Sequence, residues 1–190
     1  MSQRDRSVTP AVLEACRRGD RDAFLLVYEA YKDTVYSMAL YFFRGDAATA
    51  ADITQQVFLR LMDKIGQFKG QARFSTWLHR MVASACVDRT RGAWRRARPT
   101  DPAVLDRRAV EPGHDVELEQ RERARVIQAA LAGLTPKIRM AVVLRYFDDL
   151  SYSEMATVLN CSIGTVASRL SKGHAILSQR LAALGGKGDR

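Results

Sequence analysis

The C-terminal stretch 150–181, LSYSEMATVLNCSIGTVASRLSKGHAILSQRL, has the pattern of two helices joined by a short turn. Ser151 followed by Glu154 forms a capping box, which predicts the start of the first helix. Asn160 tolerates the left-handed conformation that a tight turn needs, and Ser162 is placed to cap the second helix. The stretch therefore predicts a helix-turn-helix, a motif whose second helix enters a DNA major groove.

The predicted second helix has two distinct faces. Its apolar positions are those of a helix packed on one side: Ile163, Val166, Leu170, Leu177 and Leu181. Another face carries small polar and basic residues at i, i+3, i+4 and i+7, the candidates for DNA contact: Thr165, Ser168, Arg169 and Lys172. An ordinary helical hairpin with a solvated outer face is the alternative for this stretch alone.

Length, composition and cysteine spacing exclude several classes of protein. The chain has 190 residues and is 47% hydrophobic, without a run near the roughly 20 apolar residues of a membrane span. Its first residues, MSQRDRSVTP, lack the apolar core of a signal peptide, so we expect a soluble cytoplasmic protein without membrane insertion. Cys16, Cys86 and Cys161 stand alone, which favours reduced structural thiols, with a redox-sensing thiol as the alternative.

The residues offer no signature of an enzyme. There is no nucleophile–base pair, no phosphate-cradling glycine motif and no metal-ligand spacing in the sequence. We therefore expect no catalytic residues, no metal and no cofactor.

The net charge of +9 is divided unevenly along the chain. Residues 60–98 hold ten basic and two acidic residues, a net +8, and residues 121–190 hold eleven and five, a net +6. Residues 99–120 between them hold two basic and six acidic residues, a net -4. Two basic blocks predict two contacts with a polyanion, whereas a generally basic surface would explain the sign of the charge but not its segregation.

Apolar residues recur at helical spacing from Ala11 to about Phe43, with a break at Gly19-Asp20, and again in the stretch 50–65, AADITQQVFLRLMDKI. Ile53, Val57, Phe58, Leu61, Met62 and Ile65 form an apolar stripe on this second helix. The opposite face carries a carboxylate, two amides and a leucine: Asp52, Gln55, Gln56 and Leu59. Polar groups around one apolar residue suit a protein partner, with a plain solvated face as the alternative.

The segment 66–98 carries the stronger basic block. The loop 66–73, GQFKGQAR, suits the clamping of an unpaired base, and equally suits a plain connection with Phe68 in the core. A helix predicted from about Thr76 to Arg96 places Arg80, Ser84, Asp88, Arg91 and Arg95 on one stripe, and five arginines within 89–98 suit phosphate contacts. The candidates for nucleic-acid contact in this segment are Phe68, Lys69, Arg73, Arg80, Ser84, Arg91, Arg95 and Arg96.

Three prolines and an excess of acid mark residues 99–119 as a flexible linker and a domain boundary. The sequence predicts an all-α fold of two small helical domains joined by this linker, the C-terminal one a helix-turn-helix. The predicted divisions are a tail and short helix at 1–19, a domain at 20–98, the acidic linker at 99–119, a domain at 120–184 and a disordered tail at 185–190.

The order of these segments resembles the extracytoplasmic-function group of bacterial sigma factors, over about residues 20–97 and 120–183. DITQQVFLRLM is similar to the family's polymerase-binding helix, and FSTWLHRMVASACVDRTR to its segment that melts and reads the -10 promoter element. LTPKIRMAVVLRYFDDLSYSEMATVLNCSIGTVASRL is similar to its -35 reading domain. The resemblance implies that 20–98 is sigma region 2 and that 120–184 is sigma region 4.

The resemblance also implies roles for individual residues and partners. Asp52, Gln55, Gln56 and Leu59 would contact core RNA polymerase through its β′ subunit, although Gln56 stands where a glutamate is usual. The candidates in 68–96 would meet the -10 element and the phosphates, and those in 165–172 the -35 element. The implied partners are the β′ and β subunits, promoter DNA and an anti-sigma factor.

A stand-alone helix-turn-helix regulator that does not use polymerase is the rival interpretation. It leaves the unusual face of the helix at 52–62 unexplained, and binding of core polymerase distinguishes the two.

Overall fold

The computed structural model describes residues 8–96, 115–148 and 150–185, and within these ranges the chain is helical with no β-strand. The predicted all-α class is therefore confirmed. The elements in chain order are α2 (Pro10–Arg17), α3 (Arg21–Phe42), α4 (Ala47–Lys64), the 3-10 turn η1 (Ile65–Gln67), α5 (Phe74–Arg96), α6 (Asp115–Ala132), α7 (Pro136–Asp148), α8 (Tyr152–Leu159) and α9 (Ile163–Gly185).

Side-chain caps set the starts of several helices. The Asp20 carboxylate accepts from the Asp22 backbone N–H at 2.9 Å and begins α3, after Gly19 has turned the chain with a φ of 83°. The Asp46 carboxylate accepts from the Thr49 N–H at 3.0 Å and begins α4. The predicted break at Gly19-Asp20 is thus confirmed, and it arises from local hydrogen bonds.

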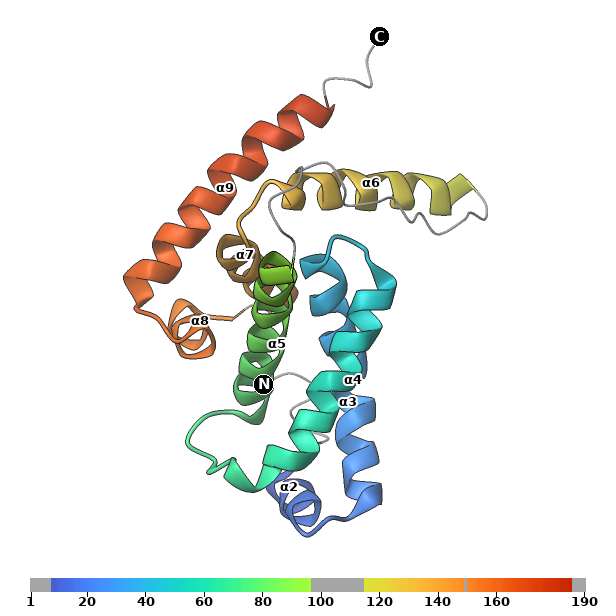
Figure 1. Cartoon of the computed structure of the whole chain (residues 1–190), viewed down its shortest axis with the longest axis vertical. Coiled ribbons are helices and arrows are strands. Elements are labelled where there is room, and N and C mark those ends of the chain that lie inside the picture. The colour runs from blue at the N-terminus through green and yellow to red at the C-terminus, as the bar shows by residue number, and fades with distance from the viewer. Residues whose placement is uncertain (1–7, 97–114, 149, 186–190) are drawn as a thin grey trace.

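The N-terminal half packs α3, α4 and α5 around one apolar core (Figure 1). Met38 of α3, Ile53 and Leu61 of α4, and Leu78 of α5 are fully buried in it. The short helix α2 packs against α3 and η1. Val8, which the sequence places in a loose tail, is also buried, so the described chain is anchored from its first residues.

The C-terminal half packs α7, α8 and α9 together, with α6 against α9. Met140, Leu144, Met155 and Leu170 form its buried centre. α7 begins at Pro136, where the fixed φ of proline and its missing N–H suit the first position of a helix.

The two halves are packed directly against each other. α5 lies beside α7 and α8, and α3 contacts α7 (Figure 1). α6 begins at Asp115, inside the range 99–119 that the sequence predicts as a linker. The rest of that linker, residues 1–7 of the predicted segment 1–19, and residues 186–190 of the predicted tail 185–190 lie outside the described residues.

Candidate nucleic-acid interface and protein-binding groove

The helix-turn-helix is built by local interactions of the kind that the sequence predicts. The Ser151 hydroxyl accepts from the Glu154 N–H at 3.3 Å, and the Glu154 carboxylate accepts from the Ser151 N–H at 2.9 Å. Asn160 adopts the left-handed conformation, with a φ of 47°. The Ser162 hydroxyl then accepts from the Thr165 N–H at 3.2 Å and starts α9.

The predicted reading face of α9 is open to solvent in part. Ser168 and Lys172 are exposed, whereas Thr165 and Arg169 are half-buried. The Thr165 hydroxyl lies 2.9 Å from the Ser162 hydroxyl, and one Arg169 nitrogen donates to the Cys161 sulfur at 3.6 Å. The turn between the two helices therefore helps to hold two of the four predicted reading side chains.

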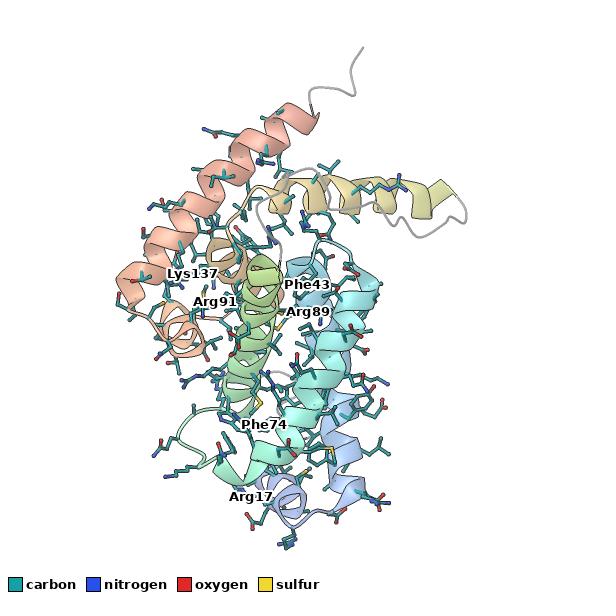
Figure 2. The ribbon with its side chains drawn as sticks, in the orientation of Figure 1. Arg17, Phe43, Phe74, Arg89, Arg91 and Lys137 are labelled. Carbon is teal, nitrogen blue, oxygen red and sulfur yellow. The ribbon has the colours of Figure 1, made fainter. Side chains whose placement is uncertain are left out.

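α5 presents a polar stripe that faces away from the core. Arg80, Ser84, Asp88 and Arg91 are all exposed, and the Ser84 hydroxyl donates to the Asp88 carboxylate at 3.1 Å. Arg89 leaves the same helix on the opposite side from Arg91 (Figure 2). The predicted stripe is therefore accessible, and the side chains of Arg95 and Arg96 lie outside the described residues.

Arg89 reaches α4, where a guanidinium nitrogen lies 3.5 Å from an Asp52 carboxylate oxygen. Both side chains are largely exposed, so this ion pair adds little to stability. It does place a cation of the basic segment next to a carboxylate of the predicted polymerase-binding face.

The loop before α5 differs from one expectation of the sequence. Phe68 is only 8% exposed, and its ring packs against the rings of Phe74 and Trp77, with centroids 5.6 and 5.3 Å away. Arg17, at the end of α2, donates a hydrogen bond from its guanidinium to the Phe68 carbonyl. Phe68 is therefore a core residue in this structure and not a platform for a base, because burying a large ring against two others is favourable.

The other two loop candidates remain on the surface. Lys69 is exposed, and an Arg73 nitrogen lies 3.5 Å from the Glu154 carboxylate of α8.

α4 exposes the whole predicted protein-binding face: Asp52, Gln55, Gln56 and Leu59. Leu59 is 56% exposed and lies with other exposed apolar side chains, so it belongs to an apolar patch and is not a lone surface leucine. Gln55 and Leu59 form one wall of a groove of about 570 Å³ between α3 and α4.

The groove contains apolar residues that the sequence interpretation missed. Leu25 and Tyr28 of α3 and Met62 of α4 line it and are exposed, whereas the apolar pattern places all three in the core. The run Leu25–Tyr28 could have predicted this exposure. Four successive apolar residues spread around more of a helix than one core can cover, so some of them must face solvent. Of these four, only Val27 is buried.

Two of the three cysteines, Cys16 and Cys86, are buried. Burial raises the pKa of the Cys86 thiol far above its ordinary value, and burial with the nearby Asp20 carboxylate raises the pKa of the Cys16 thiol. Among the described residues no group of His, Cys, Asp and Glu could hold a metal ion, and no helix is long and apolar enough to cross a membrane.

Comparisons with known proteins agree with this geometry. Residues 27–96 match Sigma-70 region 2, and residues 124–175 match Sigma-70, region 4. The RNA polymerase sigma-H factor of Pseudomonas aeruginosa is 29% identical over 181 residues, which cover 91% of this chain and 93% of that protein. The ECF RNA polymerase sigma factor SigW of Bacillus subtilis is 30% identical over 181 residues, covering 89% and 94%.

Two solved structures share the fold. CnrH in complex with the cytosolic domain of CnrY has a TM-score of 0.67 at 20% identity, covering 91% of this chain and 96% of that one. The sigma factor RpoE in complex with the anti-sigma factor NepR from Bartonella quintana has a TM-score of 0.67 at 21% identity, covering 86% and 96%.

Fold and surfaces together define a helical transcription initiation factor of the sigma-70 family. Within that family the chain belongs to the extracytoplasmic-function group of RNA polymerase sigma factors, since the likeness to SigW extends over nearly its whole length.

Proposed function

We propose that this chain binds core RNA polymerase through region 2, directs it to promoters with a -10 and a -35 element, and assists DNA melting. The observation that carries the proposal is the separation of three exposed surfaces: the polar face of α4, the cationic stripe of α5 and the outer face of α9. Residues 20–98 and 120–184 serve as the two functional domains.

The polymerase contact is the α4 face together with the groove beside it. Asp52, Gln55 and Gln56 supply hydrogen-bonding groups for the β′ coiled coil, around the exposed side chain of Leu59. Leu25 and Met62 extend this contact as an apolar floor. An apolar centre with a polar rim is the usual anatomy of a protein interface. The C-terminal domain contacts the β subunit.

The -10 contact is the α5 stripe. Arg80 and Arg91 are free to meet phosphates, and the Ser84 hydroxyl lies between them to contact a base. Lys69 and Arg73 extend the contact at one end, and Arg95 and Arg96 at the other. Unstacking a base costs a few kcal/mol, which contacts of this kind offset.

The -35 contact is the outer face of α9, with Thr165, Ser168, Arg169 and Lys172 in the major groove. The face has two cations, so most of its affinity depends on tethering to the rest of the initiation complex.

Regulation by an anti-sigma factor follows from the fold that this chain shares with RpoE, which was solved with the anti-sigma factor NepR. The site of action is the cytoplasm, where RNA polymerase works. The role is that of a binding factor and not of an enzyme.

The test is transcription in vitro with added core polymerase and mapping of the start site. Asp52→Ala weakens binding to core and leaves -35 DNA contact intact, whereas Arg169→Ala does the reverse. A purified protein that does not bind core would instead be a stand-alone helix-turn-helix regulator. Equal effects of both substitutions on core binding would contradict the division into two domains.

A further inference from the structure

The loop 66–73 is anchored to the rest of the molecule at Phe68. The Phe68 ring is buried in the aromatic cluster, its backbone N–H donates to the Ile65 carbonyl at 3.1 Å, and its carbonyl accepts a hydrogen bond from the Arg17 guanidinium. The residues that follow, from Lys69 to Arg73, are all exposed. The ring and both backbone polar groups of Phe68 thus hold the start of a loop whose remainder faces solvent.

Arg17 reaches the loop from a helix that precedes the matched domain. α2 ends at Arg17, whereas the match to Sigma-70 region 2 begins at residue 27. Leu13 and Cys16 are buried, and α2 packs against α3 and η1, so the helix is held in place. Figure 2 shows Arg17 at the same end of the molecule as Phe74, the first residue of α5. The start of the loop is therefore held from outside the segment that resembles region 2.

The guanidinium of Arg17 is engaged on two sides. Nη2 donates to the Phe68 carbonyl, and Nη1 donates to the Glu14 carboxylate at 2.6 Å, one turn earlier in α2. The nitrogens of a guanidinium are fixed in one plane, so the bond to Glu14 sets the direction of the bond to Phe68. The side chain is 31% exposed, and with both ends engaged it is placed to act through Phe68 and not by touching DNA itself.

The Phe68 carbonyl determines how the chain enters the exposed part of the loop. This carbonyl belongs to the peptide group that joins Phe68 to Lys69, and a peptide group is planar. A donor that holds the oxygen therefore also orients the backbone N–H of Lys69. Gly70 then turns the chain, with a φ of 71°. Arg17 thus fixes the backbone from which the Lys69 side chain projects.

We propose that Arg17 is a positioning residue for the -10 contact, which holds the loop in the shape that presents Lys69 and Arg73 to an unpaired base. Ordering the loop beforehand lowers the entropy that is lost when the base is captured. The inference rests on the proposed function, in which the melted -10 element is the ligand of this loop.

A role of Arg17 in stability alone has different consequences. A weakened fold reduces promoter binding by the same factor whichever base is altered. A displaced loop changes the preference only at the base that the loop captures. It also leaves binding to core polymerase unchanged, because the groove and the α4 face are lined by other residues.

The first test uses the free full-length protein and the substitution Arg17→Met, which keeps a long side chain and removes both donors. Trypsin cleaves after lysine and arginine, so the exposed Lys69 reports on the loop. Cleavage after Lys69 is expected to be about fivefold faster in Arg17→Met, because the rate follows the population of molecules in which the loop has opened. The fragments are identified by mass spectrometry.

The second test uses the complex with core polymerase on a promoter whose start site has been mapped. Each base of the non-template strand in the -10 element is replaced in turn by an abasic site, and promoter affinity is measured. The wild type is expected to lose about tenfold at the captured base. Arg17→Met is expected to lose about threefold or less at that base and as much as the wild type at the others, which is the signature of a coupled pair.

The matched control is Arg18→Met, which removes the same charge at the next, exposed position and should change neither measurement. Arg17→Lys restores one donor but cannot hold Glu14 and Phe68 together, so its values should lie between those of wild type and Arg17→Met. If circular dichroism shows that Arg17→Met is unfolded, Arg17→Lys is compared with Arg18→Lys in the same two assays.

The outcomes separate the two proposals. Equal rates of cleavage after Lys69 in the Arg17 and Arg18 variants, or the same base profile in the Arg17 variant and the wild type, overturns the positioning role and leaves the proposed function standing. Faster cleavage in the Arg17 variant together with no binding of core by any of the proteins supports the anchored loop and overturns the proposed function.

Discussion

A single arginine shows how far the role of a residue depends on its surroundings. Arg139 counts toward the basic C-terminal block in the sequence, yet the structure buries it among carbonyl oxygens. Its fork of nitrogens meets carbonyls of Leu131, Leu134 and Phe42 in fixed directions. A lysine carries the same charge at a single point and cannot reach all three.

Arg139→Lys is therefore expected to lower the free energy of unfolding by about 2 kcal/mol, because buried carbonyls lose their donors. Urea unfolding followed by circular dichroism measures the change. The control is Arg125→Lys, at an exposed position of α6, where we expect no measurable loss. Equal stabilities of the two variants would show that the carbonyl contacts contribute nothing.

The contribution of Glu154 to the stability of the fold is expected to depend on pH. The backbone N–H and then the hydroxyl of Ser151 lower the pKa of the Glu154 carboxyl, and burial opposes them. A carboxyl with a lowered pKa stabilises the fold above its ordinary pKa, and that stability is lost as the pH falls through the lowered value.

Glu154→Gln should therefore destabilise the protein at pH 7, and the difference from wild type should shrink as the pH falls below about 4.5. Unfolding by urea at a series of pH values between 7 and 3 measures it. Asp63→Asn removes an exposed carboxylate from α4 and serves as the control. A Glu154→Gln effect that is constant over this range would exclude a contribution from the ionised carboxylate.

At the scale of the element, the position of α9 depends on its close approach to α7. A Cβ added at Gly173 would lie 2.8 Å from a Val142 methyl and 3.2 Å from an Ile138 methyl, whereas at Gly164 of the same helix the nearest atom is 3.9 Å away. The first glycine is needed for packing, and the second has room for a side chain.

Gly173→Ala is expected to destabilise the protein by about 1–2 kcal/mol, since the strain of overpacking exceeds the gain in helix propensity. Gly164→Ala, which receives the same propensity gain without the clash, should stabilise it by up to about 1 kcal/mol. Thermal unfolding of both variants makes the comparison. Effects of the same sign would mean that α9 shifts freely against α7.

At the scale of the whole molecule, the two cationic faces lie on different halves of the molecule. In the proposed function they contact different parts of the promoter. Each phosphate contact contributes its own release of counterions, so losses at distant sites add.

In the complex with core polymerase, Arg91→Ala and Lys172→Ala should each reduce the slope of log affinity against log salt by about 1, and the double variant by about 2. Promoter binding measured over a range of salt concentrations tests this, with the exposed Arg125→Ala of α6 as the control. If the double variant reduced the slope no more than either single variant does, the two cations would serve one contact.

Local structure was predictable because its causes are local. The capping box at Ser151, the left-handed Asn160 and the exposed face of α4 each follow from residues within two turns of one another, so the pattern alone located them. The burial of Phe68 could be predicted only as one of two alternatives. It depends on contacts with Trp77 and with Arg17, which lies in another helix.

The amino-acid sequence by itself determined the all-helical class, the helix-turn-helix and the likeness to sigma factors. Helix periodicity and capping depend only on residues that are close together in the sequence. Only the tertiary structure decided that Leu25 and Met62 open a groove, that Arg139 is an internal junction and that the two halves close on each other. These depend on which surfaces meet across long sequence separations, and no local pattern specifies that choice.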